Sequence, residues 1–194
     1  MVVHFCLIVA LGSTATRIDE KLPSDARVKE LLIQDIFDTE PREELVRLGE
    51  KLFPTYHRLL NAPNAAWWHH AGVFDLVARS KGDRSAFLEP AVAGLGHKHV
   101  TGRRAALRLL AEIGTTKETP PILALLSDKE WTLCIAAAEA LTEMGDQRTL
   151  AALNVWLNSS AERTDKSHTE VLKHITKARD DLKARLEKAK PPGK

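Results

Sequence analysis

Apolar residues recur at intervals of three and four positions over most of the chain, the spacing that places them on one face of a helix. The alternation that marks a half-buried strand is absent after residue 11. The pattern therefore predicts an all-α protein. Outside a central region, it predicts helices over residues 24–38, 41–60 (interrupted at Pro54), 64–79, 85–95 and 167–189, with a polar loop at 158–166.

Residues 97–157 carry one pattern twice in succession. The motif AAxxLLxEIG at residues 105–114 returns as AAxxALxEMG at residues 136–145, and the register continues from Ile122 to Leu153. A fixed period of this length marks stacked repeats, in which neighbouring units share a core that no unit could bury alone. We therefore expect an α-solenoid of stacked antiparallel helix pairs, closed by a C-terminal capping helix.

Capping residues and glycines mark the predicted helix ends. Ser24 is the expected N-cap of the first helix and Asn64 that of the helix ending at residue 79. Gly82, Gly114 and Gly145 follow the first helices of three successive units at nearly equal spacing. We expect these glycines, and Gly145 above all, to end their helices with positive φ, a conformation that glycine adopts without penalty.

With this register written out, the chain resembles HEAT repeats of the bacterial HEAT-like kind also found in phycobilisome lyases. The family pattern is DxxxVRxxAxxALxxIGD. The matching residues are Arg103, Ala106, Leu110, Ile113 and Gly114 in one unit, and Ala137, Ala140, Leu141, Met144, Gly145 and Asp146 in the next. The sequence departs from the pattern at Cys134, where arginine is expected, at Gly102, where valine is expected, and at His97, near the aspartate position.

The resemblance implies a right-handed superhelix of armadillo-like, HEAT-like helix pairs. The repeats are clearest at residues 97–126 and 127–157 and weaker at 64–96 and 24–60, within a repeat region of 16–157. Residues 158–194 are expected to form a polar loop, the capping helix and a frayed basic tail. Residues 1–15 are apolar, and two interpretations are open: a signal-like segment or a first buried helix. The protein would be exported in the first case and cytoplasmic in the second.

Charge is distributed in blocks, although the formal net charge of the whole chain is only +2. Residues 79–108 carry seven basic and two acidic side chains, whereas residues 110–165 carry four basic and nine acidic ones. Blocks of alternating sign favour a polar interaction surface over a uniform nucleic-acid sheath. No segment is long and apolar enough to predict a membrane span, and the two cysteines exclude a disulfide framework.

A basic patch within residues 79–108 is the candidate site for an anionic partner. Its members are Arg79, Arg84, Lys98, Arg104 and Arg108. Arg104 and Arg108 share a helical face, and guanidinium groups suit phosphate or carboxylate. Arg103 has a structural alternative, because the arginine of the HEAT motif pairs with an acid of the next unit, here Asp128 or Glu130.

Histidines and tryptophans suggest two further sites. The clusters His69-His70 and His97-Lys98-His99 lie near the starts of consecutive units, where stacking could bring them within reach of a metal ion. Solvent-facing histidines at helix ends are the simpler interpretation. Trp67 and Trp156 fall on core-facing positions, whereas Trp68 is the candidate exposed aromatic residue. HEAT-like DNA glycosylases use tryptophan and aspartate to hold a base, and Trp68 with Asp75 is a weak counterpart.

Catalytic motifs are absent from the sequence: it contains no GxSxG, no glycine-rich phosphate loop, no HExxH and no His-Glu dipeptide. The favoured hypothesis is a monomeric, non-enzymatic HEAT-repeat scaffold without cofactor or metal, which binds a protein partner through a curved helical surface. The alternatives are nucleic-acid or anionic-ligand binding through residues 79–108, and a metal-dependent enzyme at the histidine clusters.

Overall fold

The computed structural model describes residues 22–34, 40–63, 65–160 and 166–189, and within these ranges all regular structure is helical. The expectations for residues 1–15, for Asn64 as an N-cap and for the tail at 190–194 lie outside the described residues. None of the described helices is long and apolar enough to cross a membrane.

Ten α-helices and four short 3-10 turns make up the described structure. The helices are α1 (Asp25–Gln34), α2 (Glu40–Leu48), α3 (Phe53–Leu60), α4 (Trp67–Arg79), α5 (Leu88–Gly94), α6 (Val100–Ile113), α7 (Thr119–Ala124), α8 (Trp131–Met144), α9 (Gln147–Ser160) and α10 (Lys166–Lys188). The 3-10 turns are η1 (Gly49–Leu52), η2 (Ser85–Phe87), η3 (Thr116–Glu118) and η4 (Leu125–Ser127).

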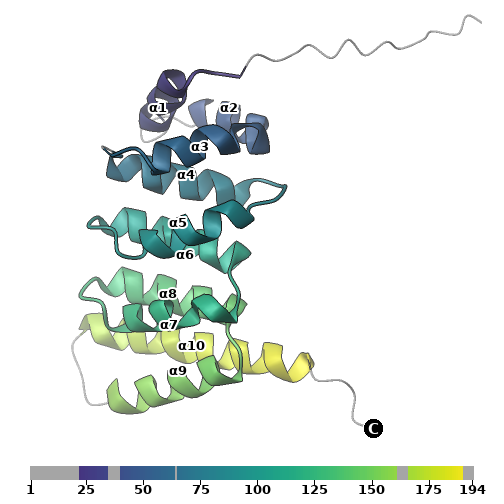
Figure 1. The fold of residues 1–194 in the computed structure, drawn as a ribbon. Helices are drawn as coiled ribbons and strands as arrows, with labels where there is room; N and C mark the ends of the chain where they lie inside the picture. The colour runs from purple at the N-terminus through teal and green to yellow at the C-terminus, as the bar shows by residue number, and fades with distance from the viewer. Residues whose placement is uncertain (1–21, 35–39, 64, 161–165, 190–194) are drawn as a thin grey trace, which may run out of the picture.

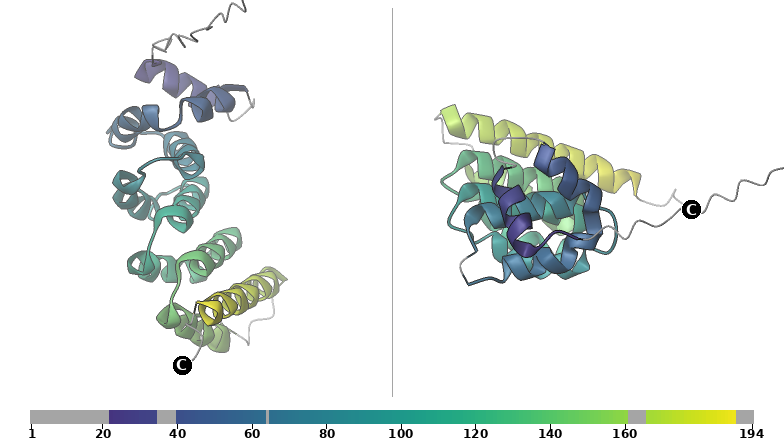
Figure 2. Two further views of the ribbon diagram at one scale, coloured as in Figure 1. Left: turned by 90° about the vertical axis from the view of Figure 1, so that its right-hand side faces the viewer. Right: turned by 90° about the horizontal axis from the view of Figure 1, so that it is seen from above.

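The helices are stacked from α1 at one end to α9 at the other, and α10 turns back to lie between α8 and α9 (Figure 1). Seen along their axes, they fall into two rows (Figure 2, left). One row contains α4, α6, α8 and α10, each packed against the next. The second row contains α5, α7 and α9, which pack against α6, α8 and α10 respectively. The chain is therefore an α-solenoid of antiparallel helix pairs, as the period of the repeated motif predicted.

The core runs continuously between the two rows. Its largest fully buried side chains include Tyr56, Phe74 and Phe87, and α8 contributes Ala137, Ala138 and Ala140, whose small side chains bring neighbouring helices close together. The last helix, α10, packs against both α8 and α9 through an apolar stripe of Val171, Ile175, Ala178 and Leu182. This stripe covers the end of the last helix pair, as expected of a capping helix.

The turns that lead into α6 and α8 are built alike, although their sequences differ. The Nδ1 atom of His97 accepts a hydrogen bond from the amide of His99 (3.1 Å), and Oδ1 of Asp128 accepts one from the amide of Glu130 (2.9 Å). A Cβ atom on Gly102 would lie 2.9 Å from Nδ1 of His97. Gly102 therefore leaves room for an imidazole where the next unit has a smaller carboxylate.

Arg103 and Cys134 form a second pair of equivalent positions in the two repeats. Arg103 donates to the carbonyl of His97 (2.9 Å) and pairs with Asp128 (3.4 Å), so the predicted ion pair to the next unit is present. The thiol of Cys134 donates to the carbonyl of Asp128 (3.2 Å), the same contact made by a much shorter side chain. Cys134 therefore preserves the hydrogen bond to this carbonyl, although it departs from the motif.

Several predicted helix ends need correction. Ser24 does cap α1, accepting from the amide of Arg27 (3.3 Å), and Gly82 has the expected positive φ of 99°. The prediction for Gly114 and Gly145 is wrong, because their φ angles are −73° and −70°.

Gly145 is needed for space rather than for its φ angle. A Cβ atom there would lie 2.5 Å from the carbonyl oxygen of Leu141, 2.8 Å from the methyl carbon of Thr149 and 3.0 Å from a methyl carbon of Leu182. The chain must pass between its own helix end and α10 at this point, and only glycine is small enough.

Two helix boundaries also differ from the sequence pattern. The predicted helix over 41–60 is broken before Pro54, at the 3-10 turn that begins with Gly49 (φ 51°). The predicted loop at 158–166 begins later than expected, because α9 continues to Ser160. In both cases burial overrides local preference, since Leu52 is fully buried next to the break and Leu153 anchors α9.

Candidate binding groove

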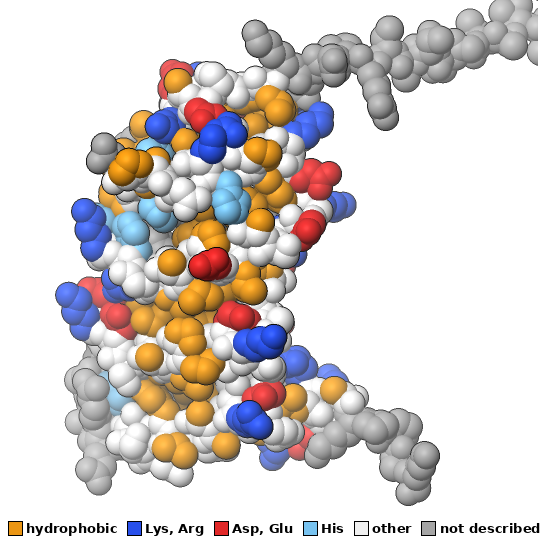
Figure 3. Space-filling view, viewed as in Figure 1, with side chains coloured by type: hydrophobic (Ala, Val, Ile, Leu, Met, Phe, Trp, Pro, Cys, Tyr) orange, Lys and Arg blue, Asp and Glu red, His pale blue; other side chains and the backbone are white. Residues whose placement is uncertain are grey.

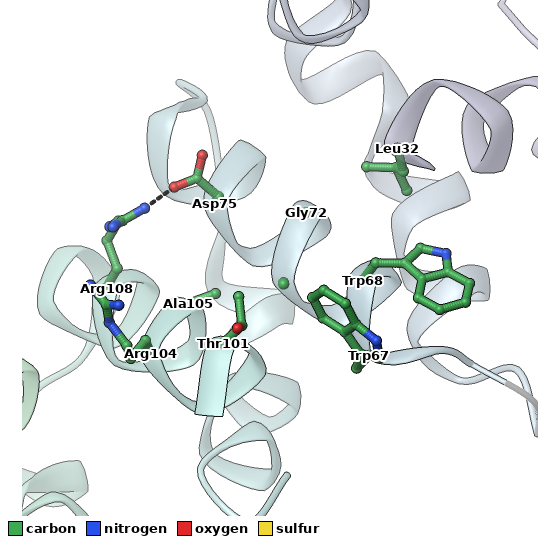
Figure 4. Close-up of a pocket in the computed structure, with 10 residues that line it drawn as sticks. Leu32, Trp67, Trp68, Gly72, Asp75, Thr101, Arg104, Ala105 and Arg108 are labelled. Carbon is green, nitrogen blue, oxygen red and sulfur yellow. Dashed lines mark hydrogen bonds and ion pairs between the residues drawn. The ribbon is translucent and has the colours of Figure 1, made fainter. Parts of the chain in front are cut away.

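A pocket of about 320 Å³ opens between α4 and α6, at the end of the row nearest α1 (Figure 4). Leu32 of α1 and the indole rings of Trp67 and Trp68 lie on one side, and Arg104 and Arg108 of α6 lie on the other. The remaining lining residues are Ala71, Gly72, Asp75, Thr101 and Ala105. The pocket thus combines an aromatic and aliphatic wall with a cationic wall, an arrangement typical of binding sites.

Small residues make the hollow possible. Gly72 and Ala105 face each other from α4 and α6 and lie between the two walls in Figure 4. Leu32 approaches so closely that a Cβ atom on Gly72 would lie 2.8 Å from its methyl carbon. A larger side chain at residue 72 would therefore push α1 away from α4 and change the aliphatic wall.

Asp75 fixes the arginine wall. Its carboxylate, 10% exposed, pairs with Arg79 one turn later on α4 (2.8 Å) and with Arg108 of α6. Burial alone would raise the pKa of Asp75, but the hydrogen bonds and charges of the two guanidinium groups outweigh it and lower the pKa. Asp75 is therefore a carboxylate that orients arginines, and a general acid is not expected here.

The pocket continues into a longer groove. A second depression, between α6 and α8, shares Arg104 and Arg108 with the pocket and adds Glu139 and Glu143. A third, between α8 and α10, shares both glutamates and adds His174, Lys177 and Asp181. We call the three depressions together the α4–α10 groove. Because each shares side chains with the next, the three depressions lie side by side across α4, α6, α8 and α10.

The predicted basic patch is largely paired within the fold. Arg79 and Arg108 hold Asp75, and Arg84 donates to the carbonyl of Ala78 (2.8 Å) and lies 4.0 Å from Glu112. Among the described residues, neither Arg104 nor Lys98 forms an ion pair, and both are exposed. Arg104 is thus the member of the patch that lies in the groove with its charge available.

The tryptophan expectations need correction. Trp68 is partly buried and lines the pocket, whereas Trp131 is the exposed tryptophan, at 44%. Trp67 was expected in the core, but it lies at the pocket with its ring 5.8 Å from that of Trp68, edge to face. Trp156 packs against the core as expected, and its indole nitrogen donates to Ser127 (3.0 Å).

The histidine clusters do come together, but in structural roles. The rings of His70 and His97 lie 4.9 Å apart, and that of His99 lies 5.8 Å from His97. His69 is buried, and its Nδ1 accepts from the amide of Ala66 at the start of α4 (3.1 Å). In the described part of the chain, no group of three or more His, Cys, Asp or Glu residues is arranged to hold a metal ion.

The face of the molecule in Figure 3 gives a contrast to the groove. Basic and acidic side chains are interspersed there with hydrophobic ones, and no block of one sign stands out. In the α4–α10 groove, by contrast, α6 contributes arginines and α8 glutamates, while α10 contributes both Lys177 and Asp181.

Sequence reasoning missed the glutamates of the groove. Glu139 and Arg108 occupy equivalent positions of successive repeats, in the register that aligns Ala105 with Ala136, and they carry opposite charge. A comparison of the charges at equivalent positions of the two repeats would have identified this reversal of sign. No sequence pattern identifies Leu32 and Thr101 as pocket residues, because only the packing of α1 and α6 against α4 brings them to the pocket.

Residues 88–173, which run from α5 into α10, match the family of HEAT repeats. The match covers somewhat less than half of the 194 residues and includes both clear copies of the motif. The fold is accordingly a HEAT-like α-solenoid. No curated protein matches the chain.

Proposed function

We propose that the protein is a non-enzymatic adaptor that binds a protein partner along the α4–α10 groove. The groove itself carries the proposal, because three adjoining depressions lie in a row across α4, α6, α8 and α10. HEAT repeats are commonly protein-interaction scaffolds, in which one row of helices presents a long binding surface. The closer kinship to bacterial HEAT-like repeats of the phycobilisome-lyase kind, and a monomeric state, belong to the same proposal.

The charges of the groove favour a protein partner over a nucleic acid. Three cationic side chains line it, namely Arg104, Arg108 and Lys177, against four carboxylates, namely Asp75, Glu139, Glu143 and Asp181. A nucleic-acid site requires an excess of positive charge along the path of the phosphates. A surface of mixed sign suits a polypeptide, which carries both charges itself.

Site-specific photocrosslinking in the native cell tests this proposal. A photoreactive amino acid is placed at Arg104 or Glu139 in the groove and, as controls, at Lys117 or Val155, which are exposed in the turn before α7 and on α9. We expect both groove positions to capture the same protein and the controls to capture none. Capture at the control positions alone, or no protein captured at either groove position, would contradict the proposal.

A further inference from the structure

The groove holds unpaired charges of opposite sign on neighbouring helices. Arg104 of α6 faces the same depression as Glu139 and Glu143 of α8, and all three side chains are exposed. Within the described ranges, none of the three forms an ion pair. Arg108, one turn from Arg104, is already held by Asp75. The groove therefore offers one cation and two carboxylates without ion pairs, of which Glu139 also lies in the field of Lys177, next to a pocket walled by aromatic rings.

We propose that the α4–α10 groove binds an extended segment of the partner protein that carries an apolar side chain, a carboxylate and a basic residue in order. The apolar side chain would enter the pocket between Leu32, Trp67 and Trp68. The carboxylate would pair with Arg104, and a Lys or Arg would lie against Glu139 and Glu143. This inference rests on the proposed function and specifies the chemistry of the partner.

The geometry of helix packing sets the spacing of this segment. Axes of packed helices lie about 8–10 Å apart, and an extended chain advances about 3.3 Å per residue. The carboxylate and the basic residue should therefore be about three residues apart. A segment that crosses from α4 to α10 passes three such spacings, which requires about eight or nine residues.

The walls of the pocket explain why an apolar side chain is expected beside the carboxylate. Trp67 and Trp68 are both partly buried and meet edge to face, so they present ring surface without filling the hollow. A volume of about 320 Å³ holds one large side chain but no folded element. Arg104 lies across the pocket from the indole rings (Figure 4), so a residue beside the buried side chain comes within its reach.

A selection for peptides tests the proposal directly. The full-length chain is used to select from a displayed library of random dodecapeptides, and an enriched peptide is measured by fluorescence anisotropy at low and moderate salt. We expect enrichment of an aromatic or aliphatic residue next to Asp or Glu, with Lys or Arg about three residues further. Arg104→Glu should weaken binding at least tenfold, and Thr101→Trp, which fills the pocket from its exposed rim, should abolish it.

The matched control is Arg148→Glu, the same charge change at an exposed residue of α9 outside the groove, which should leave binding unchanged. A charge exchange guards against effects on folding: the triple variant Arg104→Glu, Glu139→Lys, Glu143→Lys should bind the peptide with its acid and base interchanged. Circular dichroism melts verify that each variant is folded.

The outcomes separate this inference from the proposed function. In one outcome, groove crosslinks appear while the enriched peptides lack the pattern or no peptide is enriched. In that case the partner presents other chemistry, so the inference is overturned and the proposed function stands. If a single-stranded oligonucleotide binds with dependence on Arg104 and no peptide does, both are overturned. Rescue by the triple variant with the exchanged peptide supports the inference even where the natural partner is unknown.

Discussion

His97 and Asp128 occupy equivalent positions in successive repeats and accept the same hydrogen bond, each from the backbone amide of the second residue along. An imidazole and a carboxylate thus hold the turns just before α6 and α8 in the same way. The imidazole of His97 loses this acceptor when Nδ1 is protonated. The turn before α6 therefore depends on the protonation state of His97.

Mild acid should destabilise the protein through His97. Partial burial and repulsion from His70, His99 and Lys98 lower the pKa of His97, and burial also lowers that of His69. The unfolded chain, with histidine pKa values of about 6.5, then binds protons more readily than the folded one, so stability is full above that pH and falls as the pH drops below it. Melting temperatures measured at pH 7.5 and 5.5 should show the loss.

The variant His97→Asn tests whether His97 causes this loss of stability, because an asparagine oxygen accepts the same hydrogen bond without titrating. Its melting temperature should fall less between the two pH values than that of the parent protein. An equal drop for His97→Asn and the parent would show that His97 does not carry the effect.

Gly145→Ala should destabilise the fold by about 1–3 kcal/mol, because even a methyl group meets the carbonyl of Leu141 and the side chain of Thr149. Urea unfolding followed by circular dichroism measures the change. Gly145→Asn separates close approach from backbone conformation, since asparagine tolerates positive φ better than alanine does. With φ at −70°, asparagine should be no better than alanine.

Gly96→Ala is the matched control for that substitution. A Cβ atom on Gly96 would lie 3.5 Å from the nearest atom, the carbonyl oxygen of Ala93, which is ordinary contact. The change should cost no more than about 0.5 kcal/mol. If Gly145→Ala and Gly96→Ala change the free energy of unfolding equally, the close contacts around Gly145 between α8 and α10 are not present.

Arg103 and Asp128 should be energetically coupled across two repeats. Their side chains are 12% and 19% exposed, so their charges are poorly screened by water. Arg103→Ala should cost about 2 kcal/mol, because the carbonyl of His97 loses its charged donor as well. A double-mutant cycle with Asp128→Ala should give a coupling free energy of about 1 kcal/mol. If the losses of stability in the two single variants simply add in the double variant, Arg103 and Asp128 are not coupled.

Arg185 should stabilise the contact between the last two helices of the row. From α10 it donates to the carbonyl of Thr142 (2.9 Å) and to that of Gly145, at the C-terminal end of α8. A cation there satisfies free carbonyls and the helix dipole. Arg185→Ala should cost about 1–2 kcal/mol in urea unfolding, with Arg185→Lys intermediate because lysine cannot form the same fork.

Lys183→Ala, close to Arg185 in sequence but on the exposed side of α10, is the control for Arg185 and should be nearly neutral. Hydrogen exchange locates the effect: Arg185→Ala should speed exchange in α10 more than in α4. Uniform acceleration, or none, would argue against a local role.

Much of the architecture follows from the sequence alone. The period of the repeated motif and the apolar spacing fix the class of fold, because helices with one apolar face must stack to bury it. The Arg103–Asp128 pair was also predictable, since the HEAT motif places its arginine next to an acid of the following unit. Such features depend on residues close in sequence or on one repeated register.

Only the tertiary structure decided the binding groove and the part played by Gly145. The pocket requires Leu32 of α1 to lie against Gly72 of α4, and no local pattern specifies that approach. The pairing of Arg108 with Asp75, which belongs to the preceding repeat, leaves Arg104 as the available cation in the groove. Gly145 has an ordinary φ, and a Cβ atom there would meet Leu141 and Thr149 from its own segment as well as Leu182, which α10 brings from a distant part of the chain. Hydrophobic periodicity records which face of a helix is buried, whereas the atoms that meet there are set by how the helices pack.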